Sequence, residues 1–154
     1  MSVTLQEAAH SAMAFATKLF DEEGFLGPLW FINVGDRLAI VKGQFDGNDS
    51  KNAALALIRQ KFGQDATRII FVSECWMSSQ QGGWDGTPPS ERPDREELIH
   101  LIAEDREGAQ LVLTRKIERN KQGKPTLLHT EAHDYKEIGG RFASFFDRSA
   151  TAKH

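Results

Sequence analysis

The segment Ile69-Ile70-Phe71-Val72-Ser73-Glu74-Cys75-Trp76 begins with four consecutive large apolar residues. A strand with one face in water alternates apolar and polar residues, whereas an unbroken apolar run is typical of a strand covered on both faces. The segment therefore predicts a central strand that continues toward Trp76. A breaker-rich loop from Ser78 to Pro93 follows it, and loops of this length inside a compact domain are often functional.

The residues at the start of the chain predict a capped helix. Thr4 and Glu7 have the spacing of a capping box, in which each side chain bonds the backbone N–H of the other residue. Gly24 is placed to end the helix in the left-handed conformation. Between these caps, apolar residues recur at three- and four-residue spacing, as on the buried face of a helix: Leu5, Ala8, Ala9, Ala12, Ala16, Leu19 and Phe20.

A hairpin and a second helix are expected between the first helix and the central strand. Two short apolar runs, Leu29–Asn33 and Leu38–Val41, flank the pair Gly35-Asp36, which is typical of a hairpin turn. The polar residues 46–50 predict a loop that ends in a helix cap. The helix after this loop is expected to stop near Gly63.

The segment after the breaker-rich loop is ambiguous between helix and strand. Glu97–Ala103 is compatible with both, but Glu104–Gly108 looks like a turn that leads into the apolar run Leu111–Thr114. Because a turn between two such runs is typical of antiparallel strands, we interpret 97–103 as a strand. The later elements expected are a turn at 121–125, a last strand at 126–135 and a short helix at 140–147 that presents Phe142, Phe145 and Phe146.

These elements together predict one α+β domain. The chain has 154 residues, close to the commonest domain size, and its helices alternate with strands too rarely for a doubly wound fold. We expect a mostly antiparallel sheet of about five to six strands, with two main helices on one face and a short C-terminal helix. The domain is expected to cover residues 1–148, with 149–154 as a frayed tail.

Composition and charge predict a soluble protein of the cytoplasm. No apolar run is long enough to span a bilayer, and the first seven residues have neither the basic region nor the apolar core of a secretory signal. Cys75 is the only cysteine, which favours a reducing compartment. The net charge of −3 is opposite to the basic excess of general nucleic-acid binders. Neither nucleic acid nor a membrane is therefore an expected partner.

Two features of the sequence predict self-association. Residues 85–110 hold eight acidic and three basic side chains, whereas residues 111–154 hold nine basic and five acidic ones. Charge blocks usually just face water, but two faces of opposite charge can also attract a second copy of the chain. The expected cluster of Phe142, Phe145 and Phe146 adds an apolar surface. We therefore expect a homo-oligomer.

Three polar residues, His129, Glu131 and His133, alternate along the expected last strand, so their side chains share one face. Two imidazoles and a carboxylate are plausible ligands for zinc or non-haem iron. Alternate residues lie roughly 6.5–7 Å apart along a strand, and the two histidines are twice as far apart, too far for one metal ion. A polar face of an edge strand is the favoured interpretation, and no cofactor is expected.

The ends of the breaker-rich loop hold candidate ligand-binding residues. Trp76 ends the central strand and Trp84 lies in the loop, and both can stack on a planar ligand. Arg92 and Arg95 follow, and a guanidinium group is suited to holding an anion. Ligand sites often gather at strand ends beside long loops. Packing in the core or in an interface is the favoured role of Trp76.

Glu74 and Asp94 are the candidate catalytic residues. Burial beside an apolar strand raises a carboxyl pKa and suits Glu74 to acid–base chemistry. Pairing with an arginine is the more common role of such a glutamate. Pro93-Asp94 and the later Asp134-Tyr135-Lys136 match the pattern of PD-(D/E)xK nucleases, in which two acids and a lysine can hold Mg²⁺. The match is loose, because the gap is long and Asp94 precedes its strand. Cys75 is expected to be a buried structural thiol.

Three stretches, Val72–Met77, Pro89–Glu97 and Ala103–Gly108, together resemble a family of small uncharacterised proteins from bacterial and phage genomes. The resemblance implies a coherent domain of prokaryotic, cytoplasmic origin and carries over no catalytic residue. Three functions stay open. We favour a non-enzymatic binding or assembly protein that self-associates. The alternatives are a metal-dependent hydrolase or nuclease using acidic residues near residues 78–93, and a binder of a small anionic or planar ligand at that loop.

Overall fold

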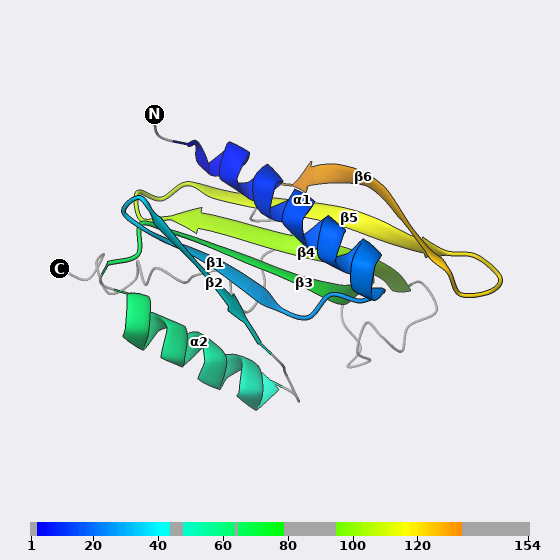
Figure 1. The fold of residues 1–154 in the computed structure, drawn as a ribbon, viewed down its shortest axis with the longest axis horizontal. Helices are drawn as coiled ribbons and strands as arrows, with labels where there is room; N and C mark the ends of the chain where they lie inside the picture. Colours follow the sequence, from blue (N-terminus) through cyan, green and yellow to red (C-terminus); the bar gives the residue numbers. More distant parts are fainter. Residues whose placement is uncertain (1–2, 44–47, 64, 79–94, 134–154) are drawn as a thin grey trace.

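The structure, a computed structural model, describes residues 3–43, 48–63, 65–78 and 95–133. Within these residues the chain has the predicted α+β fold, with one six-stranded antiparallel sheet and two helices (Figure 1). The elements in chain order are α1 (Leu5–Glu23), β1 (Leu29–Val34), β2 (Arg37–Lys42), α2 (Asn48–Phe62), β3 (Arg68–Ser78), β4 (Arg95–Asp105), β5 (Gln110–Arg119) and β6 (Pro125–His133). Neither helix is long and apolar enough to cross a membrane.

The strand order β2-β1-β3-β4-β5-β6 places β3 inside the sheet, between β1 and β4. The prediction of a central strand toward Trp76 is therefore confirmed. β3 pairs with β4 along its whole length, from Arg68 opposite Asp105 to Ser78 opposite Arg95. The ambiguous segment 97–103 is a strand, as predicted. β4 continues to Asp105, however, so the turn after it is shorter than the predicted Glu104–Gly108 turn.

The first helix begins and ends where the sequence predicts. The Thr4 hydroxyl accepts a hydrogen bond from the Glu7 backbone N–H at 3.0 Å, and the Thr4 N–H donates to the Glu7 carboxylate at 3.3 Å. Gly24 has a φ of 80° and donates its N–H to the Phe20 carbonyl at 2.7 Å. These local bonds satisfy backbone groups that a helix end would otherwise leave without partners.

The two helices cover opposite faces of the sheet, so the prediction that both lie on one face is wrong (Figure 1). Side chains alternate along a strand, and β1 and β3 are apolar on both faces. If both helices lay on one face, the apolar side chains on the other face of the sheet would be exposed to water. Against α1 the sheet presents Phe31, Ile70, Val72, Ile99, Leu101 and Leu113. Against α2 it presents Trp30, Ile32, Ile69 and Phe71.

The hairpin of β1 and β2 is closed by the predicted Gly35-Asp36 pair. Gly35 has a φ of 63°, whereas no residue other than glycine among those described has a positive φ. Glycine at the first central position of a two-residue loop is typical of a type II′ turn, whose twist suits a hairpin. Val34 therefore lies directly opposite Arg37. β2 is the strand at one end of the sheet.

Three differences from the sequence predictions concern the ends of elements. Residues 48–50 are helical rather than part of the loop, because Asn, Asp and Ser are as suitable for the first helical turn as for a loop. The last strand ends at His133 within the described residues. The predicted short helix at 140–147 and the tail at 149–154 lie outside the described residues.

Candidate functional site

A groove of about 310 Å³ lies between α1 and the hairpin of β1 and β2. α1 packs mainly across β3, β4 and β5, and on this face the β2 side chains Leu38 and Ile40 are exposed. Four large apolar side chains around the groove are exposed: Val3 at 50%, Phe15 at 40%, Leu38 at 55% and Ile40 at 42%. The described residues include only two other exposed side chains of this kind, Phe25 and Leu57. Exposed apolar surface is thus concentrated in this groove.

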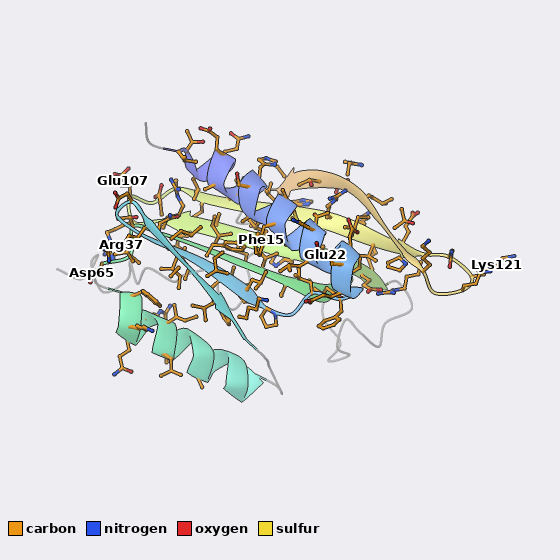
Figure 2. All side chains as sticks on the ribbon, in the orientation of Figure 1. Phe15, Glu22, Arg37, Asp65, Glu107 and Lys121 are labelled. Carbon is orange, nitrogen blue, oxygen red and sulfur yellow. The ribbon has the colours of Figure 1, made fainter. Side chains whose placement is uncertain are left out.

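The inside of the groove is apolar and ordered by aromatic contact. Phe15 projects from α1 toward the sheet (Figure 2) and meets the buried Phe31 ring edge-on, with the ring centroids 5.6 Å apart. Ile70 of β3 completes the floor. Arg68 is the one cationic residue in the described lining, and its guanidinium donates to the Val3 carbonyl at 2.5 Å. A groove of this composition is suited to an apolar strand or helix rather than to a charged small molecule.

A second candidate site surrounds Glu74 near the end of β3. One carboxylate oxygen of Glu74 accepts a hydrogen bond from the backbone N–H of Leu26. Burial raises the pKa of Glu74, and the carboxylate of Glu97 raises it further. The hydrogen bond from Leu26 and the charge of Arg119 act in the opposite direction. A carboxyl group with a raised pKa can hold or give a proton nearer to neutral pH.

Glu97 and Arg119 form an ion pair that the sequence did not predict. Arg119 donates to both Glu97 carboxylate oxygens, at 2.8 and 2.5 Å. The sequence suggested that Glu74 would pair with an arginine. In the structure Arg119 pairs with Glu97 instead, and it lowers the pKa of Glu74 only through its charge. A register shift in β5 between Arg115 and Ile117 precedes Arg119. Such an irregularity is not readable from residue spacing.

The two ends of the breaker-rich loop meet at one end of the sheet. Trp76 lies opposite Glu97, and Ser78 lies opposite Arg95, in the pairing of β3 with β4. The predicted ligand residue Arg95 is thus the first residue of β4, beside the last residue of β3. The other predicted residues of this site, Trp84, Arg92 and Asp94, lie outside the described residues.

A wider hollow of about 520 Å³ lies beside this end of the sheet, between the end of α1 and the end of β2. Leu26, whose N–H binds Glu74, lines it, as do Phe25 and Lys42. The lining also brings the ammonium group of Lys42 and the carboxylate of Glu23 to the hollow. Cys75, on the other face of β3, is partly exposed rather than fully buried as predicted.

The predicted row of His129, Glu131 and His133 lies along β6. Both imidazoles approach the Glu131 carboxylate, at 3.3 Å from His129 and 3.9 Å from His133. His133 also shares a hydrogen bond of 2.6 Å with the hydroxyl of the buried Thr114. Within the ranges that the structure describes, no group of three or more His, Cys, Asp or Glu side chains could hold a metal ion.

Sequence reasoning missed His100, which lies on β4. Burial, with a smaller contribution from the nearby His133, lowers the pKa of His100 to about 4. Ser73 and Thr114 are its direct neighbours on β3 and β5. The alternation of side chains along the strand is enough to place His100 on the face away from α1. It does not predict that His100 is buried, because burial depends on what covers that face.

Comparison of the chain with protein-family models, with curated proteins and with solved structures finds no match. The resemblance to small bacterial and phage proteins therefore stays a prediction. A proposal about function accordingly depends on the geometry of the described residues, namely the apolar groove beside the hairpin, the carboxyl group of Glu74 and the histidines of β4 and β6.

Proposed function

We propose that this protein is a non-enzymatic assembly protein that binds a second copy of itself through the apolar groove between α1 and the β1–β2 hairpin. The observation that carries the proposal is the exposure of Val3, Phe15, Leu38 and Ile40 around one groove. Burying apolar surface contributes roughly 25 cal/mol per Å², and contiguous exposed apolar patches mark interaction sites on soluble proteins.

The groove favours a protein partner over a small ligand. Its floor is made of carbon-rich side chains, and Arg68 supplies its only cationic group among the described residues. The groove also borders the edge strand β2, which has backbone groups available for pairing. A second copy of the chain brings the same apolar surface and the same edge strand, so both requirements are met by self-association.

Two finer points belong to the same proposal. A short C-terminal helix presenting Phe142, Phe145 and Phe146 would add a second apolar surface for assembly. The cytoplasm is the proposed location, because the single cysteine, Cys75, needs no oxidising compartment.

Leu38→Asp is expected to convert the assembly to monomer without unfolding it. Leu38 is 55% exposed, so the charge costs the folded monomer little, whereas burial of an unpaired carboxylate in an interface is unfavourable. Light scattering after size exclusion, over a wide range of protein concentration, measures the change. Leu57→Asp is the matched control, since Leu57 is 65% exposed on α2 and lies away from the groove. A parent protein that is monomeric at every concentration would contradict the proposal.

A second candidate function is the binding of a small anion at the end of the sheet, with Glu74 as a proton donor or acceptor. The raised pKa of Glu74 favours it, together with the hollow beside Leu26 and Lys42. If Asp94 and the neighbouring acids also converge there, a hydrolase becomes the more specific form of this proposal. Arg92, Arg95, Trp76 and Trp84 are the residues proposed to bind the ligand.

A thermal-shift screen of inorganic phosphate, small carboxylates and divalent ions tests this second function. A ligand that binds only the folded state raises the unfolding midpoint, and we expect a rise of a few degrees that Glu74→Gln removes. Glu96→Gln is the control, because Glu96 is a nearby carboxylate paired with Lys116 at the surface. An equal rise in the parent and in Glu74→Gln would exclude Glu74 from the site.

A further inference from the structure

We infer that two copies of the chain associate along the edge of β2, in antiparallel orientation, with Ala39 of each copy at the two-fold axis. The inference rests on the proposed self-association and specifies its surface and register. It predicts one continuous sheet that runs through both copies, with the two apolar grooves joined at the axis.

The backbone of β2 has one free edge among the described strands, because β2 pairs only with β1 (Figure 1). Residues that flank a two-residue hairpin loop form a hydrogen-bonded pair, and such pairs alternate along an antiparallel ladder. Arg37 therefore directs its N–H and C=O toward β1, as do Ala39 and Val41. Leu38, Ile40 and Lys42 direct theirs outward.

The edge of β2 lacks the features that usually block pairing. Edge strands are commonly protected by proline, by a bulge or by a charged side chain in the middle of the strand. Between its two ends β2 reads Leu38-Ala39-Ile40-Val41, and its pairing with β1 runs without a register shift. The charged residues Arg37 and Lys42 lie only at the ends.

Charge and parity select one register for this pairing. Outward-directed residues must face outward-directed residues, since directly opposite residues of such a pair exchange both hydrogen bonds. With Ala39 on the axis, Leu38 of one copy lies opposite Ile40 of the other, and Asp36 lies opposite Lys42. This arrangement provides about four backbone hydrogen bonds. Among the residues whose backbone groups point outward, it pairs apolar with apolar and acid with base, while Arg37 lies opposite Val41 in a pair without hydrogen bonds.

The neighbouring registers are less favourable. With Leu38 on the axis, Asp36 lies opposite Ile40, and with Ile40 on the axis, Leu38 lies opposite Lys42. In each, Asp36 and Lys42 no longer face one another, and one of them lies opposite an apolar residue in a hydrogen-bonded pair. An axis between Ala39 and Ile40 puts Arg37 opposite Lys42, so that two like charges lie side by side. It also puts residues with outward-directed backbone groups opposite residues whose groups point toward β1, so the hydrogen bonds cannot form.

The selected register also joins the two grooves. Directly opposite residues of paired strands lie on the same face of a sheet, so both copies present Leu38, Ile40 and α1 on one face. The exposed Phe15 side chains then border a shared apolar surface. Ala39, which is small, lies where the two strands approach most closely, as a non-hydrogen-bonded pair with Cα atoms about 4.5 Å apart.

Disulfide formation between copies tests the register directly. In Ala39→Cys the two new thiols lie opposite each other at a separation that a disulfide spans, so mild oxidation is expected to produce a covalent dimer on a non-reducing gel. Val41→Cys is the control. Val41 lies on the same face and packs on the same core as Ala39, but its two copies are about 13 Å apart along the strands. Both variants retain Cys75, so the control also measures cross-linking through that residue.

Charge reversal provides the second test. Asp36→Lys and Lys42→Asp each place like charges opposite one another twice in the dimer and are expected to raise its dissociation constant about tenfold. The double variant restores both pairs with reversed sign and is expected to recover most of the affinity. Sedimentation velocity measures the dissociation constants.

The outcomes separate this inference from the proposal beneath it. A parent protein that stays monomeric would overturn both. A different result would overturn only the pairing along β2 and leave self-association standing. In that case the parent dimerises and Leu38→Asp abolishes the dimer, but Ala39→Cys cross-links no faster than Val41→Cys. The charge reversals also leave the dissociation constant unchanged.

Discussion

Phe20→Ala is expected to lower the free energy of unfolding by about 3–5 kcal/mol, the usual cost of truncating a fully buried phenylalanine. Phe20 lies in the last turns of α1 and is 1% exposed. Its ring packs in the core between α1 and the sheet. Removing the ring leaves a cavity. The backbone carbonyl of Phe20, which accepts the capping hydrogen bond from the Gly24 N–H, is unchanged by the substitution. The loss therefore measures the docking of α1 and not the stability of its end.

Phe25→Ala is the matched control for this prediction. Phe25 follows the end of the same helix and is 61% exposed, so truncation is expected to change the free energy of unfolding by less than about 0.5 kcal/mol. Urea unfolding monitored by circular dichroism measures both variants. Equal losses in the two variants would contradict the packing of α1 on the sheet.

The free energy of unfolding is expected to fall by up to about 3 kcal/mol as the pH decreases from 6.5 to 4 because of His100. Burial and His133 lower the pKa of His100 from 6.5 to about 4 in the folded protein. Its Nε2 atom is buried and has no hydrogen-bond partner among the residues that the structure describes. Burial withholds water from a proton at this position, so the folded state resists protonation.

The sign of this effect follows from proton binding. Above pH 6.5 the imidazole is neutral in both states, and the folded state keeps its full stability. As the pH falls through 6.5 toward 4, the unfolded chain binds a proton that the folded chain does not, and stability is lost. Glu74 acts in the opposite direction, because its raised pKa adds stability as the pH falls toward and below 4.5.

Urea unfolding at steps across this pH range checks the prediction. His100→Gln is expected to flatten the profile, whereas His10→Gln, which removes an exposed histidine of α1, is expected to keep the profile of the parent. Glu74→Gln is expected to make the loss at low pH steeper. A profile of His100→Gln that matches the parent would show that His100 does not carry the dependence.

Local signals predicted the first helix and the hairpin correctly. A capping box, an apolar stripe and a glycine with a positive φ all act within a few residues, so Thr4, Glu7 and Gly24 are sufficient to mark both ends of α1. The Gly35-Asp36 pair closes its hairpin for the same reason. The position of β3 inside the sheet was also readable, because four consecutive apolar residues need cover on both faces.

The candidate sites were only partly predictable. Glu74 was identified from its place at the end of an apolar strand, and its pKa is raised. Its partners, Leu26 and the Glu97–Arg119 pair, come from other elements and have no shared sequence pattern. The groove was not predicted, because a strand with apolar residues such as Leu38 and Ile40 is expected to be covered, and only the path of α1 leaves it open.

The sequence by itself determined what depends on neighbouring residues: the ends of α1, the turn between β1 and β2, and the strand nature of 69–76. Only the tertiary structure decided which face each helix covers, which strand lies at the edge, and which titratable groups are buried. Those properties depend on contacts between residues far apart in the chain, such as Leu26 with Glu74 or Thr114 with His133. Residue spacing determines which side chains share a face of a strand, but the energy of burying them depends on what packs against that face.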